Sequence, residues 1–178
     1  LSFARRLAAQ WPMELPTHNL PRLLALDFDG VLTPDLALLD ARGSEAVSVS
    51  RRDGATVAWL KSMGVLVWII SREEGGPVVS RAEKLGVRCL TGVTDKRAAL
   101  AGIQETLKIS RQDTWVVGNS LDDLPMLDLA AVSFSPIDGW GPYRDRATVT
   151  LQGKGGEHLL YEIFSEHMNG RIMSQLGE

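Results

Sequence analysis

Short runs of consecutive apolar residues recur along the chain and alternate with stretches whose apolar residues repeat at helical spacing. A run that is apolar throughout is typical of a strand buried on both faces of a parallel sheet. The runs predict strands at 23–26, 65–70, 87–90, 114–117, 132–134 and, at a sheet edge, 148–151. The stretches between them predict helices at 54–63, 77–85, 96–107, 123–129 and 156–167. This alternation predicts an α/β fold: a doubly wound, mostly parallel sheet with helices on both faces.

Turn and capping residues mark the ends of several elements. Asp53 and Asp95 are expected to cap the helices that follow them, and Pro77 suits the first turn of a helix. Between the first strand and the first helix, two short β-prone runs at 36–39 and 46–50 flank an Asp-Ala-Arg-Gly segment that suits a hairpin loop. We therefore expect a β-hairpin that projects from the sheet.

The first 22 residues differ from the rest of the chain. They contain three prolines and one short helical candidate, Ser2–Gln10, and the chain begins at Leu1 without an initiator methionine. We expect residues 1–22 to be a linker, the trailing end of an upstream domain. Residues 23–170 are then a single domain, and residues 171–178 are a tail.

Composition narrows the classes of function. The chain has 178 residues, of which 44% are hydrophobic and 23% charged, enough for one domain with a full core. A net charge of -3 and a pI of about 5.7 argue against a nucleic-acid or membrane surface, and no apolar run is long enough to span a membrane. The single cysteine, Cys89, excludes an internal disulfide, and there is no Cys/His spacing for zinc. We expect a protein of the reducing cytoplasm.

Polar residues follow four of the predicted strands. They are Asp27 with Asp29, Ser71, Lys96, and Asn119 with Asp123. Taken singly, each has a plainer explanation, such as an Asp-Gly turn or a solvated lysine. The carboxyl ends of parallel strands, however, open onto one crevice, where ligands bind. Together these residues predict a single site.

The order and types of these residues resemble the haloacid dehalogenase (HAD) superfamily of phosphatases and phosphotransferases. The four motifs of that superfamily stand here as LDFDGV, IISR, TDKR and GNSLDD, and the resemblance extends from Leu23 to about Glu162. Most members carry a cap domain after the first or second motif. Residues 31–52 have room only for the hairpin and residues 72–95 only for a helix and a strand, so we expect a Rossmann-like HAD core without a cap.

The resemblance implies a catalytic role for four side chains. Phosphoryl transfer requires an in-line nucleophile, a proton shuttle and positive charge on the equatorial oxygens. Asp27 would attack phosphorus to form an aspartyl-phosphate, and Asp29 would protonate the leaving alcohol and later deprotonate water. Ser71 would donate a hydrogen bond to the phosphoryl group, and Lys96 would place its charge beside it.

The resemblance also implies a Mg²⁺ site. Its ligands would be the carboxylate of Asp27, the backbone carbonyl of Asp29 and the side chain of Asn119, with waters completing an octahedron. Asn119 occupies a position where an aspartate is usual. Asp123, or Asp122 if the loop turns differently, could compensate through a coordinated water or by orienting Lys96.

Within the superfamily, the hairpin followed by Arg52-Asp53-Gly54 is similar to 3-deoxy-manno-octulosonate 8-phosphate phosphatases and their relatives that act on sialic-acid-type sugar phosphates. In those relatives, neighbouring subunits of a homotetramer cover one another's active sites. A glycine-rich segment around Lys154 resembles their tail motif, and Arg52 and Lys154 are candidate substrate-binding residues. Arg72 is another candidate, although a solvated loop arginine is an equally good explanation.

These features predict a magnesium-dependent phosphatase that hydrolyses an octulosonate or nonulosonate sugar phosphate, assembled as a homotetramer. The rival hypothesis is a weakly active or inactive phosphatase-like module that oligomerises an acylneuraminate cytidylyltransferase. The proline-rich first 22 residues favour the rival, whereas the intact Asp27, Asp29, Ser71 and Lys96 favour an enzyme.

Overall fold

A six-stranded parallel sheet forms the centre of the computed structural model, which describes residues 20–176 and the side chains of residues 20–169. The strands lie in the order β5-β4-β1-β6-β7-β8, so β1 is central and β8 is at an edge. Their bounds are β1 Leu23–Leu26, β4 Leu66–Ile70, β5 Arg88–Leu90, β6 Thr114–Val117, β7 Val132–Ser135 and β8 Val149–Thr150. The predicted doubly wound parallel sheet is confirmed.

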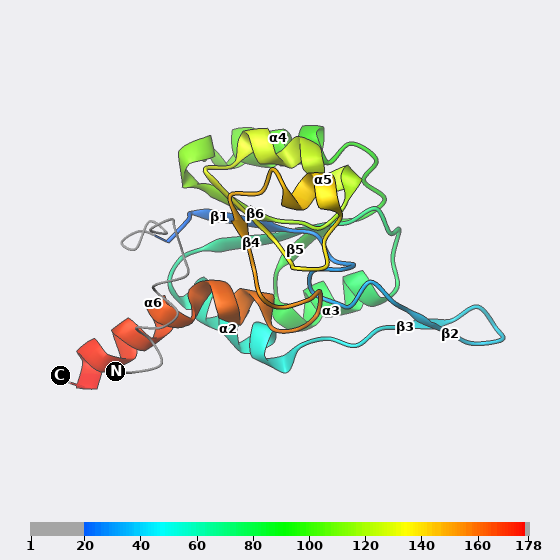
Figure 1. The fold of residues 1–178 in the computed structure, drawn as a ribbon, viewed down its shortest axis with the longest axis horizontal. Helices are drawn as coiled ribbons and strands as arrows, with labels where there is room; N and C mark the ends of the chain where they lie inside the picture. Colours follow the sequence, from blue (N-terminus) through cyan, green and yellow to red (C-terminus); the bar gives the residue numbers. More distant parts are fainter. Residues whose placement is uncertain (1–19, 177–178) are drawn as a thin grey trace.

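Helices cover both faces of the sheet (Figure 1). Three α-helices pack on one face: α2 (Arg51–Ser62), α3 (Pro77–Leu85) and α6 (Leu159–Leu176). The other face carries α4 (Lys96–Leu107), the 3₁₀ helix η2 (Leu121–Leu129) and the short α5 (Gly141–Arg144). A further 3₁₀ turn, η1 (Arg111–Asp113), precedes β6.

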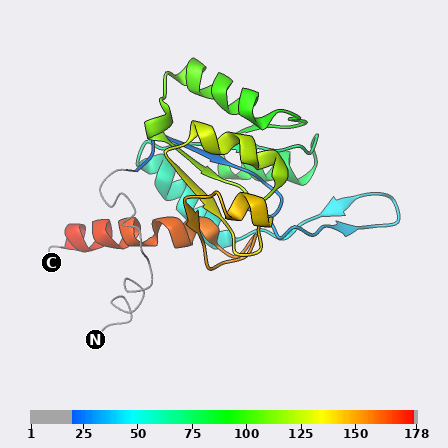
Figure 2. The same ribbon diagram turned by 45° about the horizontal axis from the view of Figure 1, so that its top comes forward.

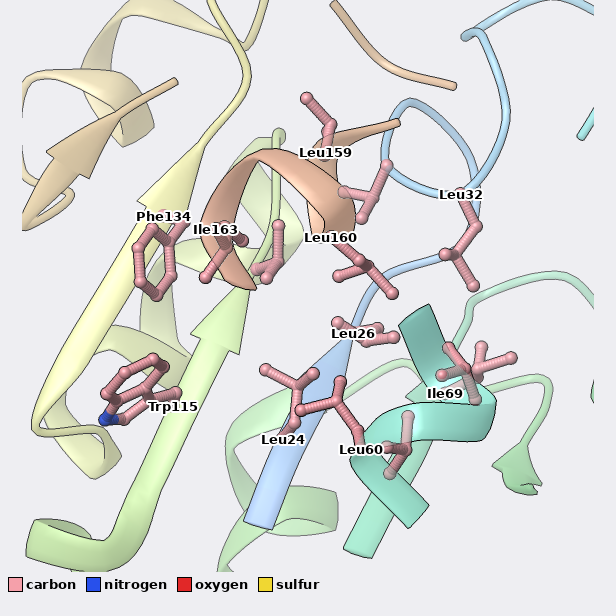
Figure 3. Close-up of a cluster of buried hydrophobic side chains, with 14 of the residues drawn as sticks. Leu24, Leu26, Leu32, Leu60, Ile69, Trp115, Phe134, Leu159, Leu160 and Ile163 are labelled. Carbon is pink, nitrogen blue, oxygen red and sulfur yellow. The ribbon is translucent and has the colours of Figure 1, made fainter. Parts of the chain in front are cut away.

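The strand β1 is buried on both sides, which explains its unbroken apolar sequence. Leu24 and Leu26 point into the cluster beneath α2 and α6, whereas Leu23 and Ala25 pack against the α4 side. Figure 3 shows the first of these clusters, where Leu24 and Leu26 face side chains of β6, α2 and α6. Burial of apolar area on both faces fixes β1 between β4 and β6 and so fixes the position of the residues that follow it.

A β-hairpin projects from the sheet, as predicted (Figures 1 and 2). It consists of β2 (Leu38–Leu39) and β3 (Glu45–Ala46), paired antiparallel, and both strands are exposed. A cap domain is absent between β1 and β5, where the structure contains only this hairpin, α2, β4 and α3. The expectation of a capless core is therefore confirmed.

Several predicted boundaries differ from the structure. Ser50, not Asp53, caps α2: its Oγ accepts a hydrogen bond from the Asp53 N–H, and Asp53 lies buried inside the first turn. The predicted helix at 123–129 is a 3₁₀ helix that begins at Leu121 and contains Pro125, which lacks the N–H that an α-helix needs. The last helix begins at Leu159 because His158 has a left-handed backbone.

Two expectations concern the ends of the chain. Residues 1–19, and with them the helical candidate Ser2–Gln10 and most of the predicted linker, lie outside the described residues. At the other end, α6 extends to Leu176, through most of the segment predicted as a tail. Among the described helices, none is both long and apolar enough to cross a membrane.

Candidate active site

The carboxyl ends of three adjacent strands bring the predicted site residues together. Asp27 follows β1 and donates its backbone N–H to the Val117 carbonyl at the end of β6, at 2.9 Å. Ser71 directly follows β4, and Asn119 lies two residues beyond the end of β6. Asp27, Ser71 and Asn119 are all buried. The sheet order β4-β1-β6 thus places three sequence-distant side chains at one edge.

Lys96 joins two buried carboxylates at the centre of this group. Its Nζ lies 2.7 Å from Asp27 Oδ1 and 2.6 Å from Asp123 Oδ1, and the Lys96 side chain is only 2% exposed. Asp95 caps α4 through the Ala98 N–H, so the first residue of the helix is held in place. The structure therefore presents Lys96 as a buried charge clamped between two acids.

Asp123 also organises the loop that follows β6. Its Oδ2 accepts hydrogen bonds from the backbone N–H of Asn119 (2.9 Å) and of Ser120 (3.1 Å), in addition to the Ser120 hydroxyl. A Cβ on Gly118 would lie 2.6 Å from the Cβ of Asp123, so only glycine allows this close approach. Both carboxylate oxygens of Asp123 are thus engaged by Lys96 and the loop.

This buried centre contains two carboxyl groups, of Asp27 and Asp123, and only one ammonium group, of Lys96. Burial and the nearby Asp123 raise the pKa of Asp27 to about 8, although Lys96 opposes both effects. Burial acts to lower the pKa of Lys96, but Asp27 and Asp123 outweigh it and raise that pKa. Two carboxylates therefore share one ammonium group, and a further cation would favour the ionised form of Asp27.

Three polar atoms converge where that cation would bind. In one orientation of its amide, Asn119 donates hydrogen bonds of 3.1 Å to the Asp29 carbonyl oxygen and to Asp27 Oδ2. With the amide reversed, its oxygen faces those two oxygens, an arrangement that suits a hard cation. No cluster of three His, Cys, Asp or Glu side chains that could hold a metal occurs in the described part of the chain. The residues present fit Mg²⁺ through one carboxylate, one carbonyl and one amide.

Asp29 occupies a more open position than Asp27. Its carboxylate accepts a hydrogen bond from Thr33 Oγ1 at 3.3 Å. Burial raises the pKa of Asp29 although the Thr33 hydrogen bond lowers it, and the nearby acids Glu73 and Asp35 add to the increase. A carboxyl with a raised pKa at the mouth of the site is suited to carry a proton.

Glycines pack the neighbouring loops against the Asp-x-Asp turn. A Cβ on Gly30, which has φ of +75°, would lie 1.9 Å from Asn119 Nδ2. A Cβ on Gly155 would lie 2.5 Å from the Gly30 carbonyl oxygen, and the Gly156 N–H donates to Val31 at 3.0 Å. The glycine-rich segment predicted around Lys154 therefore supports the turn that carries Asp27 and Asp29.

A cavity of about 150 Å³ opens onto these residues. Its walls are Asp27, Asp29, Asp35, Ser71, Arg72, Glu73, Lys96, Asn119, Ser120 and Asp122. The sequence analysis did not single out Asp35 or Ser120. Ser120 directly follows Asn119 in the fourth motif, so its position in the sequence could have predicted it. Asp35 lies at the cavity only because of the course of the chain at the base of the hairpin, which the sequence does not show.

The three predicted substrate-binding residues occupy different environments. Arg72 lines the cavity but pairs with Asp122 at 2.7 Å and is more than half exposed. The guanidinium of Arg52 lies 4.9 Å from the centre of the Tyr161 ring, on α6, and is absent from the walls of that cavity. Lys154 is exposed beside Gly155. Substrate contacts by Arg52 and Lys154 remain predictions.

Comparison with known proteins identifies the family. No model of a known protein family matches this chain. A solved structure described as a HAD family hydrolase, from Streptomyces avermitilis, is 34% identical, with a TM-score of 0.82 and coverage of 85% of this chain and 87% of that one. This chain belongs to the HAD family of hydrolases.

Other similar HAD proteins have named substrates. The structure of 3-deoxy-D-manno-octulosonate 8-phosphate phosphatase from Moraxella catarrhalis, in complex with magnesium, phosphate and KDO, is 25% identical, with a TM-score of 0.81 and coverage of 86% of this chain and 92% of that one. The enzyme of that name from Escherichia coli K12 is 29% identical over 143 residues, 80% of this chain and 76% of that protein. The chain is a capless HAD hydrolase similar to these phosphatases.

Proposed function

We propose that this HAD hydrolase is a magnesium-dependent phosphatase that acts on a sugar phosphate. The observation that carries the proposal is the contact of Lys96 Nζ with Asp27 at 2.7 Å. The other oxygen of the Asp27 carboxylate and the Asp29 carbonyl oxygen both lie next to the Asn119 amide. Phosphoryl transfer through a protein nucleophile requires a carboxylate, an adjacent positive charge and oxygens that can bind a cation. This site contains all three. The phosphatases from Moraxella catarrhalis and Escherichia coli support sugar phosphates as the substrate class.

The first half of the reaction uses the two aspartates in different roles. The carboxylate of Asp27 attacks phosphorus, and the bond from phosphorus to the sugar oxygen breaks. Asp29, whose raised pKa favours its protonated form, gives a proton to that oxygen, and the sugar leaves as an alcohol. In the second half, Asp29 removes a proton from water as the water attacks the aspartyl-phosphate, which releases phosphate and restores Asp27.

Ser71 and Lys96 hold the phosphoryl group. Ser71 Oγ already accepts the Glu73 N–H at 3.1 Å, which orients the hydroxyl and leaves its own proton to donate. Lys96 stays charged beside Asp27 and attracts the equatorial oxygens. Asp123 holds Lys96 in that position, so of its two predicted roles, a metal contact through a coordinated water or the orientation of Lys96, we assign the second.

The Mg²⁺ ligands in this proposal are the Asp27 carboxylate, the Asp29 carbonyl and the Asn119 amide oxygen. When bound, Mg²⁺ neutralises charge on the phosphoryl oxygens. The structure has the Asn119 amide in the orientation that this role requires, with its oxygen toward the other two, and the hydrogen-bonded orientation is the reversed one. The backbone of Asn119 is held by Asp123, so the two orientations differ only in the side chain.

The test is phosphate release from a panel of sugar phosphates by the full chain, with Mg²⁺ and with a chelator. The expected result is turnover of at least one sugar phosphate that stops when Mg²⁺ is removed and returns when it is restored. Equal phosphate release with and without Mg²⁺, or no release from any compound, would contradict the proposal.

An assembly role rests on a separate observation. The hairpin residues Leu36, Leu38 and Leu39 are 81%, 77% and 69% exposed, on a projection too small to bury them itself. Such exposed apolar groups usually mark an interface. We propose that the hairpin joins copies of this chain, in a homotetramer by analogy with the resembling phosphatases, whether the domain works alone or as a module of a cytidylyltransferase.

A further inference from the structure

A second cavity, of about 240 Å³, adjoins the catalytic one at the base of the hairpin. Its walls are Phe28, Asp29, Asp35, Leu36, Ala37, Glu45, Val47, Glu73, Gly75, Pro77 and Val78. The two cavities share Asp29, Asp35 and Glu73. Because Asp29 is the proposed proton donor to the leaving alcohol, this second space lies next to the leaving group, and we place there the part of the substrate beyond the phosphate ester.

The second cavity is acidic. Four of its lining residues are carboxylic acids, Asp29, Asp35, Glu45 and Glu73, and none is lysine, arginine or histidine. The start of α3 also reaches the cavity through Pro77 and Val78. A helix N-terminus contributes roughly half a positive charge, which cannot offset several carboxylates. The remaining lining is apolar, so the cavity presents hydrogen-bond acceptors and apolar surface to the substrate.

The nearest basic residues are already paired. Arg72 and Lys96 line the catalytic cavity and not the second one. Arg72 contacts Asp122 at 2.7 Å, and Lys96 contacts both Asp27 and Asp123. A sugar carboxylate in the second cavity would therefore meet like charge without a free counter-ion in the described walls. Sugar hydroxyls, by contrast, can donate hydrogen bonds to those carboxylates.

We propose that Asp35, Glu45 and Glu73 select a sugar phosphate whose sugar carries no carboxylate, and reject 2-keto-3-deoxy sugar acids. This inference rests on the proposed phosphatase activity and narrows its substrate to neutral, hydroxyl-rich sugars. The selection works by repulsion of the wrong substrate in addition to hydrogen bonding of the right one. The proposed substrate of this chain therefore has a different sugar from the substrate of the octulosonate 8-phosphate phosphatases.

The first experiment compares three compounds with the full chain and Mg²⁺: mannose 6-phosphate, 3-deoxy-manno-octulosonate 8-phosphate and p-nitrophenyl phosphate. We expect kcat/KM for the neutral hexose phosphate to exceed that for the sugar acid by at least tenfold. Raising the salt concentration should narrow this ratio, because salt screens repulsion between exposed charges. Hydrolysis of p-nitrophenyl phosphate reports on the phosphatase chemistry independently of the sugar.

The second experiment neutralises the proposed selective charges. Glu73→Gln and Glu45→Gln should each raise kcat/KM for the octulosonate phosphate by roughly threefold, since these carboxylates are exposed and well screened. Both should lower kcat/KM for mannose 6-phosphate, because a neutral amide oxygen accepts weaker hydrogen bonds from sugar hydroxyls than a carboxylate does. Glu74→Gln is the matched control, because Glu74 is the adjacent glutamate and lines neither cavity.

The outcomes separate the two proposals. Hydrolysis of p-nitrophenyl phosphate together with a preference for the sugar acid, or equal gains in Glu73→Gln and Glu74→Gln, overturns the carboxylate-free specificity and leaves the phosphatase proposal intact. Absence of phosphate release from all three compounds overturns both.

Discussion

At the scale of single residues, Asp27 is the side chain on which the proposed chemistry depends. Replacing it with asparagine keeps the shape and the contact with the Phe28 N–H but removes the nucleophile. Asp27→Asn should abolish phosphate release, with a thermal midpoint close to that of the wild type. Substantial residual activity in Asp27→Asn would exclude the covalent mechanism.

Asp29→Asn should slow turnover by roughly 100-fold to 10,000-fold, the usual contribution of acid-base assistance.

Asn119 determines the charge of the proposed metal site. An amide oxygen can ligate Mg²⁺, but it contributes no formal charge, and hard cations bind more tightly as the charge of their ligands increases. We expect Asn119→Asp to lower the Mg²⁺ concentration for half-maximal activity several-fold while turnover is kept or raised. Calorimetric titration of Mg²⁺ into both proteins measures this directly. If the Mg²⁺ affinity of the variant is unchanged, Asn119 is not a ligand.

The sequence was informative about which residues lie at the site and less so about what each one touches. Asp27, Ser71, Lys96 and Asn119 follow predicted strands, and the parallel sheet brings them together. The clamp of Lys96 by Asp123 depends on the 3₁₀ geometry of η2 and on the close approach at Gly118. The approach of Asp123 to Gly118 is local, but the contact of Lys96 with Asp123 joins residues 27 positions apart, and local pattern does not encode such a pairing.

At the scale of elements, the glycine-rich segment before α6 supports the catalytic turn. A Cβ on Gly155 would collide with the Gly30 backbone, which cannot rotate away as a side chain could. Gly155→Ala should displace the turn that carries Asp27 and Asp29, and so lower both kcat and thermal stability. Gly102→Ala, in the middle of α4 with open space around it, is the control and should stabilise the protein by about 1 kcal/mol. Full activity in Gly155→Ala would show that the two loops are not coupled.

The junction of α2 with α6 contains a buried acid with a raised pKa. Asp53 Oδ1 accepts the Tyr161 N–H at 3.1 Å, whereas Oδ2 lacks a hydrogen-bond partner among the described residues. Burial raises the pKa of Asp53 to about 6, against the lowering effect of the Tyr161 hydrogen bond. The folded protein therefore holds a proton there more tightly than the unfolded chain, and the stability from this group falls as pH rises from about 4 to above 6.

Asp53→Asn should remove that dependence. Between pH 4 and pH 7, the free energy of unfolding of the variant should rise relative to that of the wild type by roughly 2 to 3 kcal/mol, because only the wild type loses stability over this range. Urea unfolding at several pH values measures the difference. A constant offset between the two proteins across this range would mean that Asp53 has the same pKa in the folded and unfolded states.

Element boundaries show which local signals were decisive. The bounds of α3 and α4 are predicted to the residue. Pro77 and the left-handed Gly86 mark the two ends of α3, and Asp95 marks the start of α4. At α2, Ser50 and Asp53 are both good capping residues three positions apart, and the sequence alone could not rank them. Tertiary contact with Tyr161 places Asp53 inside the helix.

At the scale of the whole molecule, the exposed leucines of the hairpin predict self-association. Leu38→Glu should shift the protein toward monomers, because a charge in an apolar interface is costly to desolvate. Sedimentation velocity at micromolar concentration is the measurement. Gln112→Glu adds the same charge at an exposed position of η1 and should leave the assembly unchanged. A wild-type protein that sediments as a monomer would contradict the interface.

The central position of β1 also has a consequence for how the protein is made. In the completed sheet Leu23 pairs with Leu66 on one side and with Thr114 on the other, so the proposed nucleophile, Asp27, is positioned by segments synthesised long after it. Pairings between distant segments form late in folding, since the entropy of closing long loops must first be overcome. A chain emerging from the ribosome therefore has no hydrolase activity until β6 and the loop carrying Asp123 have left the exit tunnel. Hydrolase activity therefore appears only after β1 has paired with both of its neighbours.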